Sequence, residues 1–188
     1  CGDINAAEGI DTLTVSAWFY WTGAGNEAIV SKWAEGAGDG RPWIMMISSS
    51  KTLVGLNNNA VVNIGNTTLT TNAWHHVAFT YDANAGGTDE LITYLDGEID
   101  DTGDYATTLT NTDRSVAIGA ERVGGDPADA PASFFTGKIA DVRIYDATLT
   151  QAEIQVLASK INVDTALGAG TGDLQMHIPI AGTTIDLN

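Results

Sequence analysis

The sequence predicts an all-β protein made of two antiparallel sheets packed face to face, with one short helix near the C-terminus. Three observations lead to this prediction. Apolar and polar residues alternate over short segments, which is typical of strands with one buried face. Turn-forming residues, mainly Gly, Asn and Asp, separate these segments at short intervals. Helical periodicity follows the last predicted strand, so a sandwich or jelly roll followed by a short helix is expected.

Short segments have the alternation, or the β-branched and aromatic content, of strands. They are residues 13–21, 28–33, 43–47, 52–56, 60–64, 74–82, 91–98, 115–120 and 139–145. The segment 43–47 (WIMMI) is apolar on both faces. It is therefore either covered on both sides or presents an apolar patch to a partner or ligand. Residues 34–41 and 124–133, rich in Gly and Asp, are expected to be irregular.

The strand at residues 139–145 carries one apolar face and one mixed face. Strict alternation places Ile139 on the opposite face from Val142 and Ile144. A strand of this kind is expected to be half-buried in a sheet.

The helix that follows has a readable start. Thr150 precedes Glu153 by three residues, which is the spacing of a reciprocal capping box. Ile154, Leu157 and Ile161 then recur at helical spacing, so the helix is expected to bury one face.

Composition and charge exclude several classes of function. The chain has 188 residues, enough for one domain with a sizeable core. Its 24 acidic and 8 basic residues give a net charge of −16, which repels nucleic acid and anionic membranes. No apolar run approaches the roughly 20 residues of a membrane helix, so membrane insertion is not expected.

The single cysteine, Cys1, excludes an internal disulfide. The Asp-rich loops indicate either a solvated surface or binding of a hard cation such as calcium.

Six sequence motifs, taken in their order along the chain, indicate a protein family. They are LTVSAWFYW (13–21), IVSKW (29–33), WHHVAFTYD (74–82), YLDGE (94–98), IGA (118–120) and FTGKIADVRIYDATLTQAEI (135–154). Together they resemble the laminin-G-like jelly-roll family of the concanavalin A-like lectin/glucanase superfamily. The resemblance implies two antiparallel sheets, one of them concave, in a module that binds glycans or proteins outside cells or on particle surfaces. It also implies that a calcium ion is often held at the rim of a sheet.

The resemblance divides the chain into two parts. Residues 1–160 are expected to form the laminin-G-like sandwich, without the strand that usually opens such a domain. Residues 161–188 are expected to be a C-terminal extension, in which residues 173–188 alternate like a strand. This strand completes the domain's own edge, pairs with a neighbouring subunit, or belongs to the next unit of a tandem array.

Catalysis is not expected. Glucanases of this superfamily carry a Glu-x-Asp-x-Glu strand, whose paired carboxylates act as nucleophile and acid/base. Glu98 and Asp100 match the first half of that pattern, but Thr102 replaces the second Glu. His75 and His76 are adjacent in a strand, so they are expected to point to opposite faces and not to form one site.

The candidate ligand-binding residues are Trp33, Trp43 and Tyr105, because aromatic rings stack on the apolar faces of sugars. The alternative for each ring is a place in the core. For calcium, the resemblance implies an acid in the first segment and another in the strand 139–145. The candidates there are Asp3 or Asn5, together with Asp141. The alternative for Asp141 is a partnership with Arg143 or with a neighbouring strand.

The sequence therefore predicts a non-catalytic recognition or adhesion module that binds a glycan or a protein. It is expected outside the cell, on a cell surface or on a virion. The alternative is a structural subunit of a surface filament, surface layer or virion, in which terminal strands build a homo-oligomer.

Overall fold

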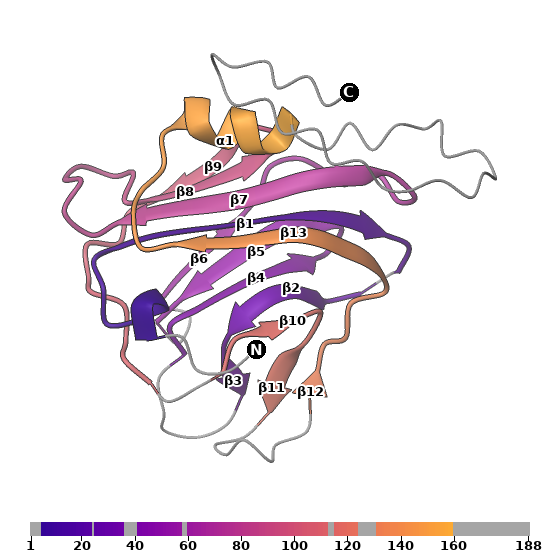
Figure 1. Ribbon diagram of the computed structural model, residues 1–188, viewed down its shortest axis with the longest axis horizontal. Coiled ribbons are helices and arrows are strands. Elements are labelled where there is room, and N and C mark those ends of the chain that lie inside the picture. The colour runs from indigo at the N-terminus through magenta and orange to yellow at the C-terminus, as the bar shows by residue number, and fades with distance from the viewer. Residues whose placement is uncertain are drawn as a thin grey trace, which may run out of the picture.

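The computed structural model describes residues 5–23, 25–35, 41–57, 60–112, 115–123 and 131–159, and these form two stacked antiparallel sheets of five strands each. The strands of the first sheet are β1 (Thr12–Trp21), β7 (Trp74–Asp82), β8 (Leu91–Leu95), β9 (Glu98–Gly103) and β13 (Gly137–Tyr145). Those of the second are β2 (Glu27–Lys32), β4 (Trp43–Ser48), β5 (Lys51–Leu56), β6 (Val61–Ile64) and β10 (Ala117–Ile118). The strand orders are β13-β1-β7-β8-β9 and β10-β2-β4-β5-β6, which confirms the predicted jelly-roll sandwich (Figure 1).

Three smaller features complete the described fold. A short 3-10 turn, η1 (Asn5–Ala7), precedes β1, and the helix α1 (Gln151–Ser159) follows β13. A third, small sheet contains β3 (Ala34–Glu35), β11 (Glu121–Val123) and β12 (Pro131–Ala132). The predictions that residues 34–41 and 124–133 are wholly irregular are therefore wrong at β3 and β12. Both strands are two residues long, too short to show a period of two, and Pro131 lies on an edge strand, where proline is tolerated.

The core lies between the two large sheets and follows the alternation of the sequence. In β1, Leu13, Val15 and Phe19 point inward and are fully buried. In β4, Trp43 points inward as well, so the outward-facing residues of that strand lie on the opposite surface of the second sheet. These inward side chains supply most of the hydrophobic stabilisation, at about 25 cal/mol for each Å² of apolar surface removed from water.

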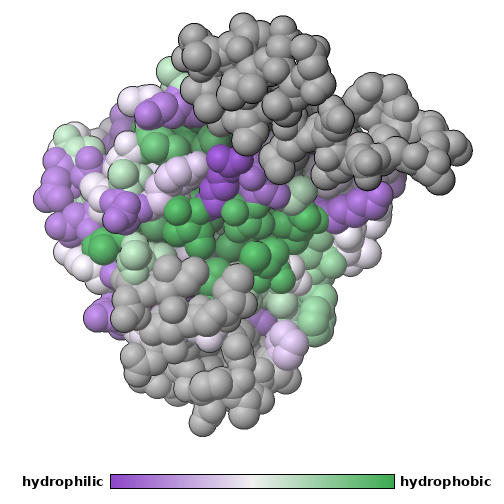
Figure 2. Space-filling view, viewed as in Figure 1, coloured by the Kyte–Doolittle hydropathy of each residue, from purple (hydrophilic) through white to green (hydrophobic). Residues whose placement is uncertain are grey.

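β13 does not keep the strict alternation that its sequence predicts. Its pairing with β1 shifts register between Ser16 and Trp18, and Asp141 adopts a positive φ of 48°. This is a β-bulge, which inserts one extra residue and reverses the faces beyond it. Ile139, Val142 and Ile144 therefore all pack against the same core, and the prediction that Ile139 lies on the opposite face is wrong. Figure 2 shows hydrophobic residues across the middle of the visible face, along β13 and the side of the sandwich below it in Figure 1.

The capping box of α1 is confirmed. The Thr150 amide donates a hydrogen bond of 2.8 Å to Glu153 Oε2, and the Glu153 amide donates one of 3.4 Å to Thr150 Oγ1. The hydrogen bonds that the Thr150 amide and hydroxyl donate to the Glu153 carboxylate lower the pKa of Glu153. Ile154 and Leu157 are buried on the outer face of the first sheet, against β7 and β8, while the predicted helical residue Ile161 lies outside the described residues.

Gly137, the first residue of β13, has no room for a side chain. Its φ is +148°, and a Cβ atom there would lie 1.9 Å from the carbonyl oxygen of Tyr20. Gly137→Ala is therefore expected to lower the free energy of unfolding by about 1–3 kcal/mol, because β1 and β13 must move apart. Urea denaturation measures the change. Gly25→Ala is the matched control, because a Cβ atom at Gly25 meets nothing within 4 Å, and an equal loss in both variants would contradict the explanation.

Candidate functional site

The outer face of the second sheet carries a hollow of about 460 Å³. Apolar side chains from this sheet and the end of β2 form part of its lining: Trp33, Ile44, Met46, Leu53 and Val62. The polar side chains in the described lining are Asn26, Ser48, Glu121 and Ser133. The hollow exists because β4 is apolar on both faces. Its inward residues fill the core, and Ile44 and Met46 are left to face the hollow on the other side.

Trp33 is the one predicted ligand residue that lines this hollow. Its side chain is only 3% exposed, because it packs against Ala28, Ile44 and Met46. The Arg41 guanidinium lies 5.4 Å from the centre of its ring, a cation–π contact. The ring therefore offers a small part of its surface to the hollow and is otherwise held rigidly in place.

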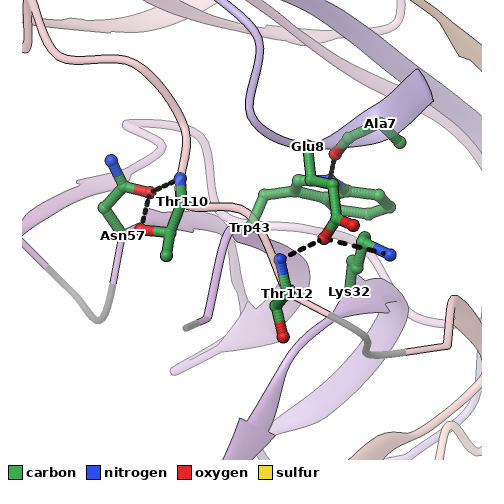
Figure 3. Close-up of polar contacts among 7 residues, drawn as sticks. All are labelled: Ala7, Glu8, Lys32, Trp43, Asn57, Thr110 and Thr112. Carbon is green, nitrogen blue, oxygen red and sulfur yellow. Dashed lines mark hydrogen bonds and ion pairs between the residues drawn. The ribbon is translucent and has the colours of Figure 1, made fainter. Parts of the chain in front are cut away.

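Trp43 does not belong to a ligand site. It is fully buried in the core between the sheets, and its Nε1 donates a hydrogen bond of 2.8 Å to the carbonyl oxygen of Ala7 (Figure 3). The prediction that its ring stacks on a sugar is wrong, because the register of β4 turns the side chain inward. In the segment 43–47, Trp43 therefore lies on the covered, inward face of β4, while Ile44 and Met46 on the other face line the hollow.

Tyr105 lies apart from the hollow. It is half-buried and packs against the core, and its hydroxyl accepts a hydrogen bond of 3.1 Å from Asn57 Nδ2. Its carbonyl oxygen accepts a hydrogen bond of 2.7 Å from the Tyr81 hydroxyl. Asn57 Oδ1 also accepts hydrogen bonds from the amide and hydroxyl of Thr110 (Figure 3). The structure thus uses Tyr105 to anchor the segment after β9 and does not bring it together with Trp33.

The predicted calcium ligands are only partly placed. Asp3 and the side chain of Asn5 lie outside the described residues. The Asp141 carboxylate accepts a hydrogen bond of 2.8 Å from Arg143 Nε, as the alternative interpretation expected. Within the described part of the chain, no group of three or more His, Cys, Asp or Glu side chains is placed to hold a metal ion. Calcium binding therefore stays a prediction.

The two acids that match half of the glucanase pattern lie on opposite faces of β9. Glu98 is exposed and accepts hydrogen bonds from Gln151 Nε2 and Gln155 Nε2 of α1, at 3.2 and 3.1 Å. Asp100 is buried and accepts hydrogen bonds from Thr52 and Thr67, towards the second sheet. A bulge opposite Thr93 and Tyr94 separates the two acids. Their carboxylates therefore cannot act together on one glycosidic bond.

The adjacent histidines point to opposite faces, as predicted. His75 Nδ1 lies 2.8 Å from Asp96 Oδ2, and this hydrogen bond raises the pKa of His75. His76 is 1% exposed and packs edge-on against Trp18, and burial lowers its pKa to about 4. Asp96 also accepts a hydrogen bond of 2.8 Å from the His76 amide. Although burial opposes the change, its bonds to both histidines lower the pKa of Asp96.

Most residues that line the hollow were not predicted from the sequence. The apolar outer residues of β4 were one available signal, since the segment 43–47 is apolar on both faces. Glu121 and Ser133 gave no signal, because they come from the small sheet and from the segment just after it.

No helix among the described residues has the length and apolar character needed to cross a bilayer.

Comparison with solved structures places this fold among known jelly rolls. The heptameric SAP-like pentraxin from Limulus polyphemus is 16% identical with a TM-score of 0.65, over 82% of this chain and 72% of that chain. The CBM40 of the Ruminococcus gnavus IT-sialidase, bound to α2,3 sialyllactose, is 14% identical with a TM-score of 0.68. The match covers 84% of this chain and 90% of that chain. A putative carbohydrate binding protein from Bacteroides ovatus is 22% identical with a TM-score of 0.61. The match covers 78% of this chain and 40% of that chain. At these identities the likeness shows the fold.

Sequence comparison gives the family. The "Sushi, von Willebrand factor type A, EGF and pentraxin domain-containing protein 1" of Rattus norvegicus is 28% identical over 101 residues, which is 50% of this chain. The match spans 3% of the length of that relative. A laminin G family model, described as the concanavalin A-like lectin/glucanases superfamily, matches residues 4–155. The chain therefore belongs to the laminin-G-like family of the concanavalin A-like lectin/glucanases superfamily.

Proposed function

We propose that this chain is a non-catalytic glycan-binding module and that the hollow on the second sheet is its binding site. The observation that carries the proposal is the pairing of an apolar lining, which includes Trp33, with polar side chains such as Asn26 and Ser48. A sugar ring has apolar C–H faces and a rim of hydroxyl groups, so it needs both kinds of contact. The volume of about 460 Å³ suits one or two sugar rings.

Two further findings support this proposal. The CBM40 from Ruminococcus gnavus is described as bound to a glycan, and the Bacteroides ovatus protein as a putative carbohydrate binding protein. The separation of Glu98 from Asp100 on β9 supports binding without hydrolysis. By analogy with its family, we place the module outside the cell, in recognition or adhesion at a cell or particle surface.

Val62→Asp tests the site. Val62 is 39% exposed and lines the hollow, so a carboxylate there introduces charge and hydration where the apolar face of a sugar must lie. Affinity for the glycans that the wild type binds on a glycan array is expected to fall at least tenfold in calorimetric titration. Ile99→Asp is the matched control, because Ile99 is 49% exposed on β9, away from the hollow. Equal losses in both variants, or release of sugar products by the wild type, would contradict the proposal.

Assembly by strand pairing is the second candidate function. β13 lies at an edge of the first sheet and carries partly buried apolar side chains (Figure 2). The bulge at Asp141 and the charge of Arg143 oppose edge-to-edge pairing, so this function ranks second. The predicted strand at residues 173–188 lies outside the described residues. A large particle in light scattering would favour assembly, and a monomer would count against it.

A further inference from the structure

Glu121 is the charged residue in the described lining of the hollow. It is only 7% exposed, and its Oε1 accepts a hydrogen bond from the Ser133 hydroxyl. Among the residues that the structure describes, no Lys or Arg side chain forms an ion pair with this carboxylate. Arg41 lies over the ring of Trp33 and is not part of the described lining. The hollow therefore presents a largely desolvated carboxylate to whatever enters it.

A buried carboxylate with few donors has a definite chemical preference. It is a strong hydrogen-bond acceptor, and it is destabilised when the water around it is displaced without replacement donors. The hydroxyl groups of an uncharged sugar supply such donors, through charge-assisted hydrogen bonds. A ligand carboxylate supplies none and meets a like charge in a site of low dielectric constant. The net charge of −16 on the chain adds to this repulsion.

We propose that Glu121 makes this site selective for uncharged glycans, by accepting hydrogen bonds from ligand hydroxyls and rejecting glycans that carry carboxylates. This inference rests on the proposed glycan-binding function. The described lining holds a glutamate and no Lys or Arg, a lining suited to neutral sugars. The selectivity separates this chain from the structurally similar CBM40 bound to α2,3 sialyllactose, which is an acidic ligand.

The test uses an array of neutral oligosaccharides, each paired with its sialylated or uronate counterpart, followed by calorimetric titration of the pairs that bind. The wild type is expected to bind the neutral member at least tenfold more tightly. Glu121→Gln is expected to lower affinity for the neutral member about tenfold, because a charge-assisted hydrogen bond becomes a neutral one. It is also expected to lower the ratio of the affinity for the neutral member to the affinity for the acidic member of each pair. Asp104→Asn, an exposed residue after β9, removes the same charge away from the hollow and should leave that ratio unchanged.

Ser133→Ala provides a second variant, because it removes the hydrogen bond that orients Glu121 and keeps the charge. It is expected to weaken binding of the neutral member less than Glu121→Gln does, with the preference for neutral sugars retained. Preference of the wild type for acidic glycans overturns the inference. An unchanged ratio in Glu121→Gln, together with loss of binding in Val62→Asp, overturns it while the glycan-binding function stands. Absence of any glycan ligand overturns both.

Discussion

Replacing Glu8 with glutamine is expected to lower the free energy of unfolding by about 3–5 kcal/mol, because the change removes one half of a buried ion pair. Glu8 Oε2 lies 3.2 Å from Lys32 Nζ, and both side chains are buried, at 2% and 0% exposure (Figure 3). The Thr112 amide donates a hydrogen bond of 2.9 Å to the same oxygen. Glutamine keeps an acceptor for that amide. The loss of stability therefore measures mainly the removal of the negative charge beside Lys32.

Urea denaturation of Glu8→Gln, Lys32→Met and the double variant completes a thermodynamic cycle. The double variant is expected to be more stable than Glu8→Gln alone, because a buried ammonium group is no longer left without this carboxylate. A double variant whose loss equals the sum of the two single losses would contradict the coupling. Proteolysis of the segment before β1 gives a second measurement, since Glu8 ties that segment to residue 112.

This pair also shows what the sequence could not reveal. Glu8 and Thr112 are separated by 104 positions, and neither lies in a motif or in a periodic segment. Glu8 meets Lys32 because the Lys32 side chain points into the sandwich from β2, where its ammonium group is buried beside the Glu8 carboxylate. Long-range polar contacts of this kind depend on how the loops are placed, and alternation within a segment says nothing about them.

The strands themselves could be predicted well because one face of each is buried. A period of two appears in β1 and β7 without interruption, and Leu13 and Val77 lie inward as the pattern indicates. The prediction failed in β13 because the bulge at Asp141 moves Ile139 to the inner face. A bulge is a backbone event that leaves little trace in hydrophobicity.

The candidate site was predicted only in part, for a related reason. Trp33, Trp43 and Tyr105 were chosen by residue type, and the register of their strands and loops separates them. Trp33 meets Glu121 in the hollow because β11 pairs with β3, which begins directly after Trp33. Strands of two or three residues carry no readable pattern, so the residue that we propose determines selectivity could not be found from the sequence.

Acidification is expected to destabilise the protein through His76. Burial lowers the pKa of His76 from 6.5 to about 4 in the folded chain, with Asp96 and Asp141 opposing the change and Arg143 adding to it. Between pH 6.5 and 4, the unfolded chain binds a proton at this residue that the folded chain does not bind. Stability therefore falls as the pH falls through this window, by up to about 3 kcal/mol for this residue.

His75 acts in the opposite direction. Its pKa is raised by the hydrogen bond to Asp96, so its stabilising contribution is fully present below pH 6.5 and is lost as the pH rises through its folded pKa. The wild-type dependence of stability on pH includes both of these opposing effects, and variants are needed to separate them. His76→Phe keeps a ring against Trp18 and removes the titration, whereas His75→Gln removes the contribution that favours low pH.

Urea denaturation at pH 7 and at pH 4.5 measures both histidines. The stability lost on acidification is expected to be smaller by about 2–3 kcal/mol in His76→Phe than in the wild type, and larger in His75→Gln. The lowered pKa of Asp96 adds a loss only as the pH falls through its folded pKa, below 3.8, so the chosen pH values keep that carboxylate ionised. If His76→Phe lost as much stability as the wild type, the buried imidazole would not be the origin of the acid sensitivity.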